Sequence, residues 1–80
     1  MMSKKVYQII AKVMNIDIST ISDDLGPETV ESWTSFKGYV LLYELESGFN
    51  VKFSINDAMD VKNIADIKRH LRNKGIVVDE

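Results

Sequence analysis

The stretch ESWTSFKGYVLLYELESGF, residues 31–49, has the pattern of a helix around which the rest of the chain can pack. Its apolar side chains recur at helical spacing and are expected to face inward as one broad stripe. This stripe consists of Phe36, Val40, Leu41, Leu42, Leu45 and Phe49. Thr34 and Ser35 stand where such a helix would begin, and the hydroxyl of either can cap it by accepting from a backbone N–H of the first turn. The sequence therefore predicts a central helix that begins at Thr34 or Ser35.

The composition excludes several classes of function. A chain of 80 residues is expected to form one domain, residues 1–80, with a core close to the smallest that folds without a disulfide or a metal. Cysteine is absent, which excludes a disulfide framework, thiolate metal sites and a cysteine nucleophile, and which fits a reducing cytoplasm. The net charge of −2 gives no electrostatic reason to bind nucleic acid or an anionic membrane. No signal peptide or transmembrane span is predicted.

A second amphipathic helix is predicted before the central one, at about residues 3–15, with Ser3 as its cap. Its inward face consists of Val6, Ile9, Ile10, Val13 and Met14. A long connection over residues 16–33 follows, marked by Gly26 and by the only proline, Pro27. Apolar residues recur along this connection, so we expect an ordered loop that is pinned to the helices and has room for a helical turn.

Two more helix starts follow the central helix. Gly48 permits a change of direction near its end, and the alternating segment 49–53 has no strand partner, so it is interpreted as loop. The residues from Ser54 to Asp57 form a capping box that opens a short helix through Met59. Residues 63–66 have the same capping-box pattern and open a last helix that ends before Gly75. Its inward face consists of Ile64, Ile67 and Leu71. The predicted fold is all-α: a small four-helix bundle of three main helices and one short helix, with a long first loop.

Basic residues gather in and near the last predicted helix. They are Lys62, Lys68, Arg69, His70, Arg72 and Lys74. This cluster is typical of a solvated helix face, and binding of an anionic partner such as nucleic acid is the less favoured alternative. His70 lies between charged residues, which predicts a surface position.

No enzymatic or metal site is predicted. The acidic residues before the central helix, Asp23, Asp24, Glu28 and Glu31, lack the alternating spacing of a calcium-binding loop. The single histidine cannot form a zinc site by itself, and no recognisable base stands beside any serine. The chain is therefore not expected to be an enzyme or to bind a metal.

The motif Trp33-Thr34-Ser35-Phe36 and the residues that follow it form a pattern that extends over the rest of the chain. Together with Leu41, Leu45-Glu46, Phe49, the short helix and Asn63-Ile64-Ala65-Asp66, it resembles the acyl carrier proteins, particularly the branch whose motif reads Trp-Asp-Ser-Leu. The resemblance covers nearly the whole chain.

The resemblance implies a carrier function for Ser35. In that family the matching serine holds a 4′-phosphopantetheine arm, which a phosphopantetheinyl transferase attaches from coenzyme A. Acyl groups are then held as thioesters on the terminal thiol of the arm. A cytoplasmic monomer of a specialised biosynthetic pathway is implied, which handles fatty acid, polyketide or related acyl groups and meets acyl-loading and acyl-transfer enzymes. A phosphodiester at a helix N-terminus also meets unpaired N–H donors and the positive end of the dipole.

Ser32 and Thr29 are rival attachment sites. Counting from Ser35 places Leu45 ten residues on and Phe49 fourteen residues on, which is the register of the family motif. Either rival would require an insertion within the helix, and three extra residues rotate a helix by most of a turn. The spacing therefore favours Ser35.

The sequence departs from the family pattern around Ser35. Thr34 replaces the aspartate before the serine and Phe36 replaces the leucine after it, while Lys37 and Val40 fall on a face that is usually acidic. The residues expected to affect partner recognition are Thr34, Phe36, Lys37, Val40, Glu44 and Glu46. Partners that dock by opposite charge should find an altered surface. The alternative interpretation is an unmodified carrier-like fold that acts as a protein-interaction module.

Apolar residues that could shelter an acyl chain are predicted from the resemblance and the periodicity together. They are Leu42, Leu45, Phe49, Ile55, Met59 and Ile64, and ordinary core packing is the alternative role for all of them. Tyr39 and Tyr43 are bulky, which favours a short or polar cargo. Gly38 costs roughly 1 kcal/mol against alanine inside a helix, so it either lets an arm or partner approach closely or is simply tolerated.

Overall fold

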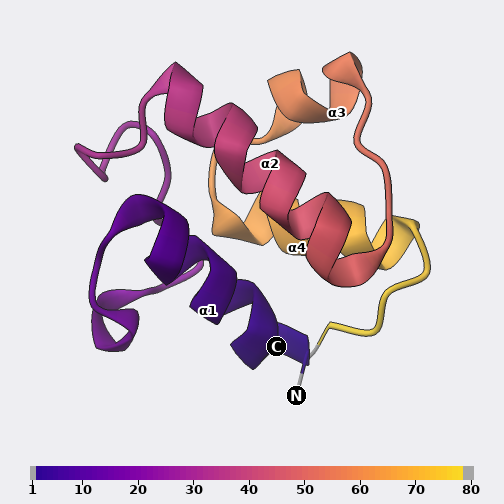
Figure 1. Cartoon of the computed structure of the whole chain (residues 1–80), viewed down its shortest axis with the longest axis horizontal. Helices are drawn as coiled ribbons and strands as arrows, with labels where there is room; N and C mark the ends of the chain where they lie inside the picture. The colour runs from indigo at the N-terminus through magenta and orange to yellow at the C-terminus, as the bar shows by residue number, and fades with distance from the viewer. Residues whose placement is uncertain (1, 79–80) are drawn as a thin grey trace.

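The computed structural model describes residues 2–78, which form four α-helices and one short 3₁₀ helix. The α-helices are α1 (Met2–Met14), α2 (Ser35–Phe49), α3 (Ile55–Asp60) and α4 (Ile64–Asn73), and the 3₁₀ helix is η1 (Ile18–Thr20). No strand occurs between residues 2 and 78. In the view of Figure 1, α2 lies between α1 and α3. The predicted all-α fold, with three main helices, one short helix and a long first loop, is confirmed.

The core lies between α1, α2 and α4 and contains most of the predicted inward residues. Its buried apolar side chains are Val6, Ile10, Val13, Met14, Val30, Trp33, Leu41, Leu45, Phe49, Ile64, Ile67, Leu71 and Val78. Ile9, Val40 and Leu42 are partly buried against this cluster. Phe36 is exposed, so its predicted place on the inward stripe is wrong. Phe36 is five residues before Leu41, and five residues are about 500° of helix, which is 140° away from the buried stripe.

The close approach of α1 to α2 explains Gly48. A Cβ on Gly48 would lie 2.9 Å from Cδ1 of Ile9, so a larger residue there would require the end of the Ile9 side chain to move. Lys5 of α1 donates through Nζ to the Gly48 carbonyl. The change of direction predicted at Gly48 occurs instead at Asn50, the cap of α2, whose φ of 57° is left-handed. Asparagine tolerates this conformation better than most residues.

Two predictions at the ends of α1 are corrected by the structure. The helix begins at Met2, so Ser3 lies within it and is not the residue that precedes it. It ends at Met14, and Asn15 follows with a left-handed φ of 58°. The hydroxyl of Ser32 donates to the Met14 carbonyl at 2.7 Å, which satisfies one acceptor at this helix end.

The long first loop is ordered by hydrogen bonds to the start of α4. The backbone N–H of Ile64 donates to the Leu25 carbonyl at 2.9 Å, and that of Ala65 donates to the Asp23 carbonyl at 2.9 Å. Gly26 lies so close to this helix start that a Cβ would stand 2.1 Å from the Lys62 carbonyl oxygen. The predicted pinned loop and its helical turn, η1, are therefore confirmed.

A buried lysine on α4 was not predicted. Lys68 belongs to the cluster interpreted as a solvated face, yet its side chain is 1% exposed. Its Nζ donates to Tyr7 Oη at 3.0 Å and to the two carboxylate oxygens of Asp23 at 3.0 and 3.1 Å. Tyr7 Oη also donates to Asp23 at 2.7 Å. This cluster, the Asp23–Lys68–Tyr7 network, joins the first loop, α1 and α4.

Opposing effects set the pKa values in this network. Burial alone would raise the pKa of the Asp23 carboxyl, but hydrogen bonds from Tyr7 and Lys68 outweigh it and hold the pKa below its ordinary value. Burial alone would lower the pKa of Lys68, but its hydrogen bonds to Tyr7 and Asp23 outweigh this effect and raise the pKa above its ordinary value. Both side chains are therefore charged at neutral pH.

His70 is also buried, so its predicted surface position is wrong. Its Nε2 lies 2.9 Å from Asp60 and its Nδ1 lies 3.6 Å from Asp57, both on α3. Arg69 donates to Asp60 at 2.7 Å, and this bond, followed by the contact with His70, lowers the pKa of the Asp60 carboxyl. Charged sequence neighbours are typical of an exposed residue. Here, however, Arg69 and His70 of α4 both contact Asp60 of α3.

The short helix α3 is held mainly at its ends and by charge. Ser54 and Asp57 form the predicted capping box, with hydrogen bonds of 3.0 Å in both directions. Lys74 of the chain after α4 donates to Asp57 at 2.9 Å, and this bond is the main reason that the pKa of the Asp57 carboxyl falls to about 2. None of the residues of α3 is buried. α3 therefore lies on the surface of the bundle and contributes no buried residue to its core.

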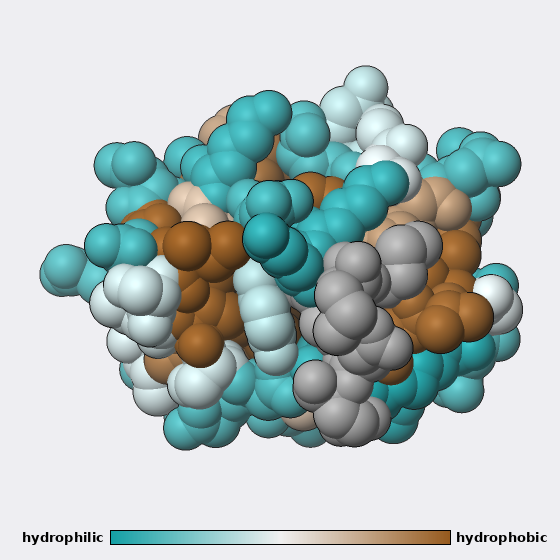
Figure 2. All heavy atoms as spheres, turned by 90° about the horizontal axis from the view of Figure 1, so that it is seen from below, coloured by the Kyte–Doolittle hydropathy of each residue, from teal (hydrophilic) through white to brown (hydrophobic). Residues whose placement is uncertain are grey.

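The surface is mixed in polarity. On the face seen in Figure 2, apolar side chains gather in two patches with polar side chains between and around them. No helix in residues 2–78 is both long and apolar enough to cross a bilayer. Over the same residues, no three His, Asp or Glu side chains converge in a way that could hold a metal ion.

Candidate functional site

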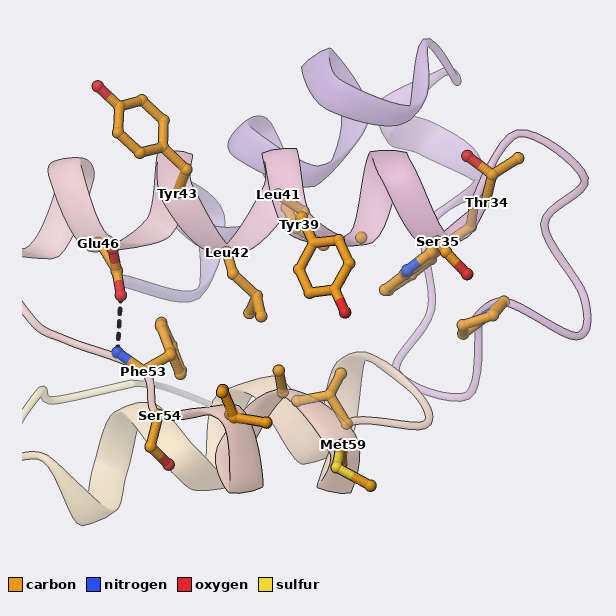
Figure 3. A pocket seen from close by; sticks show the side chains of 16 residues that line it. Thr34, Ser35, Tyr39, Leu41, Leu42, Tyr43, Glu46, Phe53, Ser54 and Met59 are labelled. Atoms are coloured by element: carbon orange, nitrogen blue, oxygen red, sulfur yellow. Dashed lines mark hydrogen bonds between the residues drawn. The ribbon is translucent and has the colours of Figure 1, made fainter.

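A cleft of about 850 Å³ lies between α2 and α3, and Ser35 lines it at the start of α2. Figure 3 shows α2 on one side of this cleft and α3 on the other. Tyr39 and Leu42 contribute from α2, and Ile55 and Met59 contribute from α3. The cleft therefore combines one hydroxyl at a helix start with predominantly apolar walls.

Thr34 is the residue that caps α2. It has extended backbone angles, φ −83° and ψ 173°, and its Oγ1 accepts from the Lys37 backbone N–H at 3.2 Å. Ser35 is consequently the first helical residue, which settles the two alternatives for the helix start. An aspartate at position 34 could make the same hydrogen bond, so threonine keeps the cap and lacks the negative charge.

Ser35 is exposed, and its hydroxyl has no side-chain hydrogen-bond partner within residues 2–78. The Gly38 backbone N–H donates to the Thr34 carbonyl at 2.8 Å, as expected for the first turn. The N–H groups of Ser35 and Phe36 have no acceptor within the described part of the chain. These two donors and the helix dipole make the surroundings of Ser35 Oγ favourable for an anion such as a phosphodiester.

Two tyrosines of α2 take different directions beside the cleft. Figure 3 shows the ring of Tyr39 turned toward α3, between Ser35 and Leu42, whereas the ring of Tyr43 turns away from α3. Both rings are largely exposed. Tyr39 narrows the cleft beside the serine, and Tyr43 extends the apolar surface outside it.

Glu46 closes the far end of the cleft. Its carboxylate accepts from the Phe53 backbone N–H at 2.8 Å (Figure 3), which fixes the segment between α2 and α3 to α2. Glu46 was predicted as a partner-recognition residue, and the structure gives it a hydrogen bond within the protein. This hydrogen bond partly offsets the negative charge of Glu46, so Glu46 attracts an external cation less strongly than an unengaged carboxylate would.

The residues predicted to shelter an acyl chain divide into two groups. Leu42, Ile55 and Met59 line the cleft. Leu45, Phe49 and Ile64 are buried in the core and do not line it. A ligand in the cleft would therefore contact only the first group, and the space behind the cleft is filled by core side chains.

The other predicted partner-recognition residues differ in how available they are. Phe36 is exposed, whereas Val40 and Glu44 are half-buried. Lys37 donates through Nζ to the Val13 carbonyl at 3.2 Å, in the last turn of α1, where a cation is favoured by the helix dipole. Lys37 thus has a structural partner, and Phe36 is the most accessible of these four side chains.

The comparisons with known proteins bear on the fold. No family model matches the chain, and no curated protein matches it by sequence. Among the solved structures that match is a candidate acyl carrier protein from Mycobacterium tuberculosis, with a TM-score of 0.83 over 92% of this chain and 99% of that one. The chain has the acyl-carrier fold. The sequence identity in this match is 22%, so the likeness establishes the fold.

Several residues that line the cleft were not predicted as site residues. They are Trp33, Tyr39, Phe53, Ala58 and Val61. Trp33 is buried with its indole beneath Gly38, where a Cβ would lie 3.6 Å from Nε1. This is ordinary van der Waals distance, so the fold itself does not require glycine there. Tyr39 had a usable signal, because it lies four residues after Ser35 and so on the same side of the helix.

Proposed function

We propose that this protein is an acyl carrier whose Ser35 hydroxyl holds a 4′-phosphopantetheine arm. The observation that carries the proposal is the position of Ser35: an exposed hydroxyl at the first residue of α2, beside two unpaired backbone N–H groups and at one end of an apolar cleft. The likeness in fold to a candidate acyl carrier protein supports it. The arm would also supply the thiol that a chain without cysteine lacks.

The attachment reaction uses one atom of this chain. Ser35 Oγ forms a bond to the pantetheine-bearing phosphorus of coenzyme A, the bond from that phosphorus to the adenosine 3′,5′-bisphosphate breaks, and a base of the transferase takes up the hydroxyl proton. The resulting phosphodiester is an anion at the N-terminus of α2, where the dipole and the free donors stabilise it. Thr34 holds these donors in place because it caps the same turn.

The remaining parts of the proposal concern how such a carrier works. It acts as a monomer in the cytoplasm, it is not itself an enzyme, and acyl-loading and acyl-transfer enzymes of a fatty acid, polyketide or related pathway act on its thioester. The cleft accepts a short or polar acyl group, because Tyr39 narrows it beside Ser35 and the core behind it is filled. Recovery of the carrier with a long fatty acyl chain buried in it would contradict this last point.

The test is an intact-mass measurement after coexpression with a broad-specificity phosphopantetheinyl transferase. We expect a gain of one phosphopantetheine, which is lost in Ser35→Ala. The matched controls are Ser32→Ala and Thr29→Ala, which remove the two rival hydroxyls and should keep the gain. A gain that persists in Ser35→Ala, or no gain with several transferases, would refute the assignment. The second result would favour an unmodified protein-interaction module, for which the missing aspartate at position 34 is the supporting observation.

A further inference from the structure

Large apolar side chains are exposed around the cleft far more than elsewhere on the described surface. Seven large hydrophobic residues of residues 2–78 are exposed; four of them line this one cleft, and a fifth, Phe36, lies on α2 next to Ser35. They are Phe36 (73% exposed), Tyr39 (69%) and Tyr43 (64%) on α2, and Ile55 (80%) and Met59 (75%) on α3. We call these five residues the aromatic face. Contiguous exposed apolar surface of this kind marks an interaction site.

The aromatic face follows from the spacing of its members. Phe36, Tyr39 and Tyr43 stand at i, i+3 and i+7 and form one stripe along α2. Ile55 and Met59 stand at i and i+4 and form a second stripe along α3. On α2 the stripe lies away from the buried Leu41, Leu45 and Phe49, and α3 has no buried residue, so the core uses neither stripe. Aromatic residues and methionine are the types enriched at protein–protein contacts.

Three charged side chains next to the aromatic face are engaged within the protein. Glu46 accepts from the Phe53 backbone, and Asp57 is bonded to Lys74. On the other side, Lys37 donates to the Val13 carbonyl, as described above. In addition, α2 has no acidic residue in its first turn. A partner that approaches this face therefore meets mainly apolar side chains, and Glu44 is the charged side chain of α2 beside them that has no partner within residues 2–78.

The position of Ser35 decides what kind of molecule can occupy the face. This step rests on the proposed function, in which Ser35 bears an arm that must enter another protein. A second copy seated permanently on the aromatic face would cover the start of α2 and obstruct the arm. The occupant is therefore a transient partner that needs the arm.

We infer that the aromatic face is the docking surface for the enzymes that act on the arm at Ser35, and that the partner surface facing it is apolar and not a cluster of lysine and arginine. Tyr39 and Tyr43 are the expected anchors, since tyrosine supplies a large contact area together with a hydroxyl that can hydrogen-bond at the rim. Charge attraction then adds little, so the affinity depends only weakly on salt.

The test uses the unmodified full chain and a broad-specificity phosphopantetheinyl transferase, which is one enzyme that must approach Ser35. Binding is measured by calorimetry without coenzyme A, at about 50 mM and about 500 mM NaCl, where screening lengths differ about threefold. We expect the Kd to change less than about threefold with salt and to rise about tenfold or more in Tyr39→Ser and in Tyr43→Ser. The matched control is Glu44→Gln on the same helix, which should bind like the wild type. Circular dichroism checks that the variants fold.

Three results would overturn the inference. The first is binding that weakens about tenfold or more in high salt and in Glu44→Gln but not in the tyrosine variants. The second is a dimer of the free chain, seen by sedimentation and dissociated by Tyr39→Ser, because a second copy would then occupy the face. The third is no binding to any transferase tested. Intact mass separates these results from failure of the proposed function: a protein that gains phosphopantetheine on Ser35 without using the tyrosines is still a carrier.

Discussion

Removal of Asp23 is the sharpest test of how the first loop is held on the bundle. Asp23→Ala leaves Lys68 with a 1% exposed side chain and only Tyr7 Oη, at 3.0 Å, as a hydrogen-bond partner. Removing one member of a fully buried ion pair costs about 3–5 kcal/mol. The Asp23 side chain is 41% exposed, so water can enter the space that it vacates and the loss is smaller. We expect a decrease of about 2 kcal/mol in the free energy of unfolding.

The reciprocal variant gives the comparison that makes this prediction specific. Lys68→Met replaces the buried ammonium by an apolar side chain of similar volume, and Asp23 can turn to water, so a loss below about 1 kcal/mol is expected. For a domain of this size, the loss of about 2 kcal/mol lowers the Tm of Asp23→Ala by roughly 8–16 °C relative to the wild type. Urea and thermal denaturation followed by circular dichroism measure both variants. A Lys68→Met protein that is less stable than Asp23→Ala would refute the reasoning.

The pH dependence of the same network has a fixed sign. The pKa of Asp23 is lower in the folded protein than its ordinary value of 3.8, so its contribution to stability is complete above pH 3.8 and is lost as the pH falls through the folded value. The pKa of Lys68 is raised above 10.5, so its contribution is complete below pH 10.5 and is lost as the pH rises through the folded value. The stability difference between wild type and Asp23→Ala should therefore be constant around neutrality and shrink at both extremes.

Three further predictions concern other parts of the fold. Gly38→Ala should stabilise the protein by roughly 1 kcal/mol in urea denaturation, because the new methyl group meets only Trp33 at ordinary contact distance; a loss of stability would contradict the helix argument. Gly26→Ala should destabilise it by more than about 2 kcal/mol, because a Cβ 2.1 Å from the Lys62 carbonyl oxygen forces the loop off α4; an unchanged Tm would be the contrary result. The contribution of Asp57 should be complete above pH 3.8 and disappear toward pH 2, and carboxyl NMR titration of wild type against Asp57→Asn checks this window.

The helices and their starts could be predicted from the sequence because their signals are local. Residues four apart on α2, such as Leu41 and Leu45, share one face of a helix wherever that helix packs. The capping box of Ser54 and Asp57 likewise depends on four consecutive residues only. The same local pattern places the start of α2 at Thr34 or Ser35, and the resemblance to the acyl carrier proteins is what singles out Ser35 as the candidate site.

The errors concern residues whose environment is made by distant segments. Lys68 and His70 have charged sequence neighbours and read as exposed, but their partners Asp23 and Asp60 lie 45 and 10 residues away. The walls of the cleft could not be predicted for the same reason. Tyr39 and Met59 line it together only because of where α3 lies in the fold. Periodicity can identify the inner side of a helix, but it cannot show what stands opposite the outer side.

The attachment of α3 by charge and caps has a consequence for how proteins with this architecture can diverge. Core substitutions commonly cost 2–5 kcal/mol of a total stability of about 5–15 kcal/mol, whereas most surface substitutions stay within about 0.5 kcal/mol. Because α3 has no buried residue, selection can exchange Ile55, Ala58 or Met59 without threatening the folded state. For folding alone, the α3 wall of the cleft can thus vary from lineage to lineage, while α2, which forms the opposite wall, is constrained by Leu41, Leu45 and Phe49 in the core.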